Sequence, residues 1–168
     1  MRGPSLFRPS RIAPTPMKIL TVCLGNICRS PMAEGILRHL AHEQGITVIT
    51  DSAGTSDYHV GEAPDPRAQA AMVRQGMEIG DLRARQFRAS DFTEFDMILA
   101  MDASNLSNMR ALAPTAELAS KARLVMDHAP WRPEREVPDP YFGGDEGFDE
   151  VHAMLTDALQ ALLKDVAR

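Results

Sequence analysis

A short apolar segment, residues 17–22, runs directly into a glycine-containing turn and then into a helix start, and this junction restricts the possible folds strongly. The segment is too short for a helix, and its mostly apolar character is typical of a strand buried on both faces. Ser30 and Pro31 are expected to cap and to open the helix that follows, and residues 36–41 give it an apolar stripe. A buried strand joined so closely to a helix indicates an α/β fold.

The alternation of strand-like and helix-like segments continues along the chain. Apolar or β-branched runs at residues 46–50, 97–101 and 123–126 predict strands, and residues 64–75 and 148–166 predict helices. Strands that alternate with helices form parallel sheets, so we predict a parallel sheet with helices packed on it. Ligands of open α/β sheets bind beyond the carboxyl ends of the strands, which makes the loop after the first strand the first candidate site.

Composition restricts the function classes. A chain of 168 residues with 44% hydrophobic residues suits one domain, and a net charge of -5 offers no broad cationic surface for nucleic acid or anionic lipid. Two cysteines exclude a disulfide scaffold, and no secretory leader or membrane span is recognisable, so we expect a cytoplasmic protein. The five histidines show no metal-ligand spacing, so we expect no metal and no other cofactor.

Residues 1–16 are predicted to be a disordered basic extension, followed by one domain at residues 17–168. The extension carries three arginines, four prolines and no acidic residue, a composition that does not fold alone. Two explanations stay open, because Met17 opens the first strand directly. The segment is either a true extension or the result of an assigned start site that lies too far upstream.

The loop at residues 23–31 combines the groups that phosphoryl transfer needs. Five residues separate Cys23 from Arg29, and a helix start follows. A thiolate is the useful nucleophile, and a free cysteine is mostly protonated at neutral pH because its pKa is roughly 8.5. The positive end of the helix, inward N–H groups and the Arg29 guanidinium would favour the thiolate and would also bind phosphoryl oxygens. Gly25 and Asn26 tolerate the positive φ that turns such N–H groups inward. The residues expected to surround the phosphate are Leu24, Gly25, Asn26, Ile27 and Cys28.

Two residues of this loop keep two interpretations each. Ser30 has two candidate roles, to cap the helix and to donate its hydroxyl to the sulfur when the thiolate is the leaving group. Cys28 is either a small buried apolar residue or a redox partner whose disulfide with Cys23 would block or protect the nucleophile. Sequence spacing does not decide between the two interpretations of Cys28.

Asp139 is the candidate general acid. It lies between Pro138 and Pro140, which restrict the backbone on both sides and so give the carboxylate a stiff mount. The segment alone reads more readily as an ordinary turn, since Asp-Pro commonly starts turns. The cysteine loop changes that interpretation, because an acid is needed to protonate the leaving group and later to accept a proton from water. Tyr58, and Tyr141 with Phe142, are candidate aromatic walls for a flat leaving group.

With these residues assembled, the chain from Met17 onward resembles the low-molecular-weight protein tyrosine phosphatases. The motifs that carry the resemblance are residues 23–31, 51–55, 64–68, 84–86 and 137–141, together with Met101-Asp102 and Ser104-Asn105. The resemblance implies a single α/β domain with a four-stranded parallel, Rossmann-like sheet and helices on both faces. It also implies a phosphocysteine on Cys23, transition-state binding by Arg29 and acid catalysis by Asp139.

The resemblance implies further roles outside the reacting groups. Asn26, Ser30 and Ser52 would belong to a hydrogen-bond network that holds the loop, and Tyr58 and Tyr141 match wall positions. Some members carry tryptophan where Tyr58 stands and a second tyrosine at position 142.

The predicted function is therefore hydrolysis of phosphotyrosine in proteins and of aryl phosphates, with inorganic phosphate or another oxyanion as a ligand of the same site.

A protein arginine phosphatase is one alternative, although such relatives tend to carry threonine at position 27, and apolar Ile27 suits an aryl ester better. A thiol-coupled arsenate reductase would pass oxidation to downstream cysteines, and this sequence has none after Cys28. A non-catalytic phosphotyrosine-binding module would be expected to lose the cysteine or the acid, and both are present.

Overall fold

The structure is a computed structural model that describes residues 15–167, so the predicted extension lies almost entirely outside the described residues. The elements, in chain order, are β1 (Met17–Cys23), α1 (Arg29–Glu43), β2 (Val48–Gly54), α2 (Pro66–Arg74), α3 (Asp91–Glu94), β3 (Met97–Ala100), α4 (Ala103–Arg110), α5 (Ala116–Ala119), β4 (Ala122–Leu124), the 3-10 helix η2 (Val125–His128) and α6 (Asp145–Val166).

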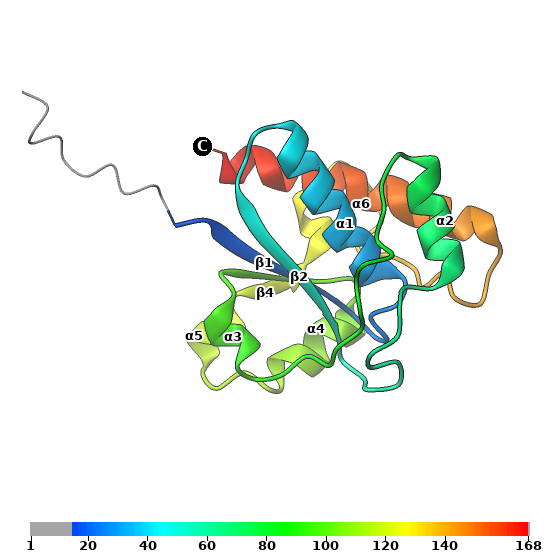
Figure 1. The fold of residues 1–168 in the computed structure, drawn as a ribbon. Coiled ribbons are helices and arrows are strands. Elements are labelled where there is room, and N and C mark those ends of the chain that lie inside the picture. Colours follow the sequence, from blue (N-terminus) through cyan, green and yellow to red (C-terminus); the bar gives the residue numbers. More distant parts are fainter. Residues whose placement is uncertain (1–14, 168) are drawn as a thin grey trace, which may run out of the picture.

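The four strands form one parallel sheet in the order β2-β1-β3-β4. Helices α1, α2 and α6 cover one face, and the short helices α3, α4 and α5 cover the other, with a separate apolar cluster beneath each layer (Figure 1). The predictions of a single α/β domain, a four-stranded parallel sheet and helices on both faces are thus confirmed.

The strand order places one loop in a special position. From β1 the chain moves to β2 on one side of it, and it then crosses to β3 on the other side. The loop that leaves the carboxyl end of β1 therefore lies at the point where the strand order reverses, which is where open α/β sheets bind ligands.

The sequence predicted the existence of the strands better than their bounds. The second strand was expected at residues 46–50, but β2 runs from Val48 to Gly54, because its later residues pair with β1 up to Cys23 and Gly54. The first helix was expected to begin with Ser30 as its cap and Pro31 as its first residue. That expectation is wrong, because α1 already begins at Arg29 and its N-cap residue, Cys28, makes no side-chain capping bond.

The last helix, α6, is amphipathic as its spacing predicts. Phe148, Val151, Leu155 and Leu159 are fully buried against the sheet and its neighbouring helices. In the part of the chain that the structure describes, no helix is both long enough and apolar enough to cross a membrane.

Candidate active site

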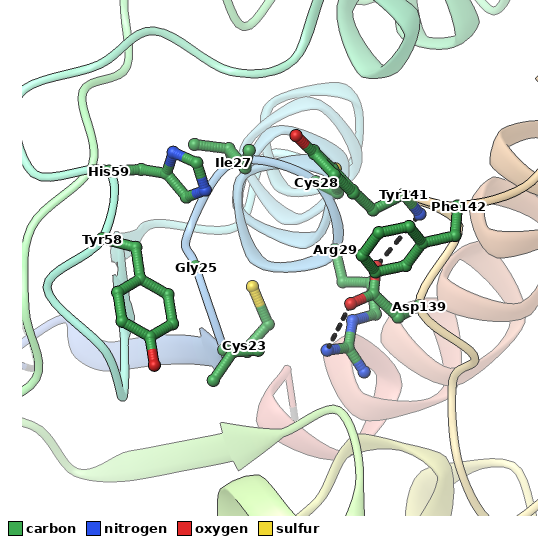
Figure 2. A pocket seen from close by; sticks show the side chains of 11 residues that line it. Cys23, Gly25, Ile27, Cys28, Arg29, Tyr58, His59, Asp139, Tyr141 and Phe142 are labelled. Atoms are coloured by element: carbon green, nitrogen blue, oxygen red, sulfur yellow. Dashed lines mark hydrogen bonds and ion pairs between the residues drawn. The ribbon is translucent and has the colours of Figure 1, made fainter.

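Cys23 is the last residue of β1, and the following residues fold over its sulfur (Figure 2). Asn26 adopts the left-handed conformation, with φ of 58°, and its backbone N–H donates to Cys23 Sγ at 3.3 Å. The loop comes so close to β2 that a Cβ atom on Gly54 would lie 2.7 Å from the Leu24 carbonyl oxygen. Glycine at this position therefore allows the loop to lie against the sheet.

Behind the sulfur lies a buried hydrogen-bond network that begins at Ser30. The Ser30 hydroxyl lies 3.1 Å from Cys23 Sγ and accepts a hydrogen bond from Asn26 Nδ2 at 2.7 Å. Asn26 Nδ2 also donates to Ser52 Oγ at 3.0 Å, and Ser52 Oγ donates to Glu34 Oε1 at 2.8 Å. Of the two roles left open for Ser30, the geometry brings its hydroxyl to the sulfur and not to the helix end.

Glu34 is the buried, titratable end of this network. Burial raises the pKa of the Glu34 carboxyl above its ordinary value, and the charge of Asp51 acts in the same direction. The hydrogen bond from Ser52 and the charge of Arg38 oppose these two effects.

Arg29 lies in the first turn of α1 and is almost fully buried, with only 3% of its side chain exposed. Its Nη1 atom donates to Asp102 Oδ2 at 2.7 Å and to the carbonyl oxygen of Val137 at 3.0 Å. Among residues 15–167 all hydrogen bonds from this guanidinium leave from Nη1, so Nε and Nη2 stand ready for two oxygens of a ligand. Burial acts to lower the pKa of Arg29, but the charges of Cys23 and Asp102 hold it above its ordinary value.

Asp139 reaches the same place from residues 137–144, a segment without helix or strand that we call the acid loop. Its Oδ2 lies 3.7 Å from Arg29 Nη2, and its Oδ1 accepts a hydrogen bond from Tyr141 N at 3.1 Å (Figure 2). The structure thus brings together the three residues that the sequence analysis proposed as catalytic, Cys23, Arg29 and Asp139.

These residues open into a pocket of about 220 Å³. In Figure 2 the Tyr58 ring stands on one side of the Cys23 sulfur, with Asp139 and Tyr141 on the other. Tyr141 packs edge-on against Phe142, and Phe142 is 91% exposed. The residues that line the pocket are Cys23, Leu24, Gly25, Ile27, Cys28, Arg29, Tyr58, His59, Asp139, Tyr141 and Phe142.

Cys28, the second cysteine, lies in the wall of this pocket and is buried. Both cysteines are free thiols. Burial raises the pKa of the Cys28 thiol far above its ordinary value, and the neighbouring Asp65 raises it further. The thiol form of Cys28 suits the interpretation as a small buried apolar residue, and redox pairing with Cys23 stays a prediction.

Three residues of the site were missed as functional candidates by the sequence analysis. Asp102 holds Arg29, Glu34 ends the network behind Ser52, and His59 lines the pocket with its Nδ1 3.1 Å from Glu62 Oε2. Asp102 carried a usable signal, because it follows the carboxyl end of a predicted strand, where ligand sites lie. Within residues 15–167 there is no cluster of three or more side chains suited to hold a metal ion.

Comparison with known proteins points to one family. Residues 18–168 match the family model for low molecular weight phosphotyrosine protein phosphatase. The chain is 42% identical to the low molecular weight protein-tyrosine-phosphatase of Streptomyces coelicolor over 153 aligned residues. This alignment covers 89% of this chain and 93% of the relative.

Solved structures agree with this match. The protein tyrosine phosphatase from Entamoeba histolytica, with Hepes in the active site, superposes with a TM-score of 0.86 at 37% identity, covering 90% of this chain and 97% of the other. A Drosophila arginine phosphatase superposes with a TM-score of 0.85 at 33% identity, covering 90% of this chain and 99% of the other.

Proposed function

Because the chain belongs to the low molecular weight phosphotyrosine protein phosphatase family, we propose that it hydrolyses phosphotyrosine in proteins, and aryl phosphates, through a phosphocysteine on Cys23. The observation that carries this proposal is the convergence of three groups in one pocket. The Cys23 sulfur receives an amide hydrogen bond at 3.3 Å, the hydrogen bonds of the buried Arg29 guanidinium to other described residues leave from Nη1 alone, and the Asp139 carboxylate lies 3.7 Å from its Nη2.

In the first half-reaction the Cys23 thiolate attacks phosphorus, and the bond from phosphorus to the tyrosyl oxygen breaks. Asp139, in its protonated form, gives its proton to that oxygen, so tyrosine leaves as the neutral phenol. Nε and Nη2 of Arg29 bind two equatorial oxygens of the phosphoryl group, and inward amides of residues 24–28 bind the remaining charge. The Tyr58 and Tyr141 rings flank the aromatic leaving group.

In the second half-reaction a water molecule attacks the phosphocysteine. Asp139 accepts the proton of that water, and the bond between phosphorus and sulfur breaks to release inorganic phosphate. The hydroxyl of Ser30, 3.1 Å from Cys23 Sγ, donates to the departing thiolate, and Asn26 and Ser52 hold that hydroxyl in place. The Hepes in the active site of the Entamoeba histolytica phosphatase supports the proposal that this pocket also takes inorganic phosphate or another oxyanion.

The test is turnover of p-nitrophenyl phosphate by the wild type and by two variants. Cys23→Ser should abolish turnover, and Asp139→Ala should lower kcat by about 10² to 10⁴-fold, the usual contribution of general acid–base catalysis. Acid quench during turnover should trap phosphate on the wild type and on Cys28→Ser, but not on Cys23→Ser. Full turnover by Cys23→Ser, or activity that a chelator removes, would contradict the proposed mechanism.

A second candidate is the dephosphorylation of phosphoarginine in proteins. The likeness to the Drosophila arginine phosphatase favours it, because that protein is similar over 90% of this chain. Ile27 argues for phosphotyrosine, since it is buried in the pocket wall and offers an apolar surface to an aryl ester. Phosphotyrosine, phosphoserine and phosphoarginine peptides assayed side by side should show the highest kcat/KM for phosphotyrosine.

Two further proposals concern the setting of this reaction. The match to residues 18–168 supports residues 17–168 as the phosphatase domain. We propose the cytoplasm as its compartment, because a catalytic thiol beside a second free cysteine is kept reduced there.

A further inference from the structure

The acid loop depends on contacts with the rest of the protein for its position. At its first residue, Val137 N donates to Met101 O at 2.8 Å, and Val137 O accepts from Arg29 Nη1 at 3.0 Å. The restricted backbone around the two prolines of the loop carries this fixed geometry forward to Asp139. The opposite end, which leads into α6, is held by a side chain from α2.

That side chain is Arg67, which lies in the first turn of α2. Its Nη2 atom donates to the carbonyl oxygen of Tyr141 at 2.9 Å, and its Nη1 atom donates to the carbonyl oxygen of Gly143 at 3.3 Å. The guanidinium carbon also lies 5.5 Å from the centroid of the Tyr141 ring and 4.8 Å from that of Phe148. Arg67 therefore binds both the backbone and an aromatic ring of the acid loop.

Asp65 holds the other side of the same guanidinium. Arg67 Nε donates to Asp65 Oδ1 at 3.1 Å and Arg67 Nη2 donates to Asp65 Oδ2 at 3.0 Å, so the pair is bidentate. Asp65 N donates in turn to the carbonyl oxygen of Ile27 at 2.8 Å. A continuous path of hydrogen bonds thus joins the loop that carries the nucleophile to the loop that carries the acid.

We propose that Arg67 is a positioning residue of this phosphatase: it fixes the acid loop against the loop at residues 23–28, so that the Asp139 carboxylate stands where it can protonate the leaving oxygen. The inference rests on the proposed function, since it assigns Arg67 a role that acts through Asp139. A lysine would keep the charge, but its single ammonium group would not hold Asp65 and two carbonyl oxygens in one plane.

The experiment compares Arg67→Met and Arg67→Lys with wild type on aryl phosphates whose leaving phenols differ in pKa. A misplaced acid harms poor leaving groups most, so kcat/KM of Arg67→Met should fall about 10- to 100-fold for phenyl phosphate. For p-nitrophenyl phosphate, whose leaving group needs little help, the loss should be much smaller. Log kcat/KM should therefore decline more steeply with leaving-group pKa, and Arg67→Lys should give an intermediate slope.

Arg74→Met is the matched control. Arg74 lies on the same helix and binds Asp149 of α6 at 2.7 Å, so its loss removes a comparable exposed contact without touching the acid loop. Arg74→Met should keep the wild-type slope. A double-mutant cycle completes the test, because Arg67→Met should have no further effect on the slope in an Asp139→Asn background.

Two outcomes would overturn the inference. One is an equal loss of kcat/KM for all leaving groups in Arg67→Met, which would indicate a purely structural role. The other is an added change of slope in the Asp139→Asn background. A wild-type slope in Asp139→Asn itself would instead refute the proposed role of the acid, and so the two failures are distinguishable.

Discussion

Asp102 gives the sharpest test of how the site is held together, because its two carboxylate oxygens have different tasks. Oδ2 accepts from Arg29 Nη1 at 2.7 Å, and Oδ1 accepts from Asn105 N at 2.8 Å and so caps α4. Asparagine has a single acceptor oxygen and therefore cannot serve both. In Asp102→Asn that oxygen can keep the cap, and the amide nitrogen then faces the Arg29 guanidinium. In Asp102→Ala both bonds are lost.

The expected losses in the free energy of unfolding follow from these two hydrogen bonds. A hydrogen bond to a charged group contributes about 1.5–3 kcal/mol, so Asp102→Asn should lower the free energy of unfolding by about this amount. Loss of an N-cap costs about 1 kcal/mol more, which gives about 2.5–4 kcal/mol for Asp102→Ala. Activity should not follow the same order. Both variants release Arg29 and should lose about 10- to 100-fold in kcat/KM, the range expected for a misplaced catalytic group.

The assays are urea unfolding at neutral pH and kcat/KM with p-nitrophenyl phosphate. Thr115→Ala is the control for capping, because Thr115 Oγ1 accepts from Leu118 N at 3.1 Å at the start of α5, on the sheet face opposite to α1 and α6. It should lose about 1 kcal/mol and no activity. Wild-type kcat/KM in Asp102→Asn would refute the conclusion that Asp102 orients Arg29, whatever its stability.

Three further changes test other parts of the site. Gly54→Ala places a Cβ 2.7 Å from the Leu24 carbonyl oxygen, so it should lower the free energy of unfolding by about 1–3 kcal/mol and reduce kcat/KM. Unchanged values of both quantities would contradict the close approach of the loop to β2. The raised pKa of buried Glu34 means that the folded protein binds this proton more tightly than the unfolded chain, so the contribution of this carboxyl to wild-type stability should fall as pH rises above 4.5, the ordinary value for glutamate. Glu34→Gln keeps an acceptor for Ser52 and removes that pH dependence, so urea midpoints measured from about pH 4 to about pH 8 should diverge in favour of the variant, and parallel curves would count against it. Phe142→Ala should change stability by less than about 0.5 kcal/mol because the ring is 91% exposed, and a raised KM for phosphotyrosine peptides at constant kcat would support its place in the wall.

The arrangement of the loop at residues 23–29 was predictable from sequence because its parts are consecutive. Cys23 ends a recognisable buried strand, Asn26 takes the left-handed backbone of the turn, and Arg29 opens the helix, so the local pattern alone placed these groups together. Asp139 needed more, since its proline-flanked segment gained meaning only from the chemistry of a loop far away in the sequence. The structure brings them within reach because the acid loop is anchored through Val137 to Arg29 and to the end of β3.

The contacts of Asp102 and Arg67 depend on how the strands and helices are arranged in space, and the sequence pattern does not give that arrangement. Asp102 follows β3, and it meets Arg29 because β3 lies beside β1 in the sheet. Arg67 reaches the acid loop because α2 packs beside α6 (Figure 1). The error at Ser30 has a different cause, for a serine before a proline is a good helix cap. Here the Ser30 hydroxyl accepts from the side-chain amide of Asn26 and lies 3.1 Å from the Cys23 sulfur, and the helix begins two residues earlier than expected.

Asn26 explains how so short a loop keeps its shape around the Cys23 sulfur. Its left-handed backbone turns the N–H toward Cys23, and its side-chain amide donates to the hydroxyls of Ser30 and Ser52. Its Oδ1 accepts from Arg85 N at 3.0 Å, which ties the loop to the chain beyond β2. Aspartate at this position would lack both side-chain donors and would add a negative charge beside the Cys23 sulfur, whereas glycine would lose all three side-chain bonds. Asparagine combines tolerance of the turn with two donors and an acceptor, so one residue serves both the backbone geometry and the network behind the Cys23 sulfur.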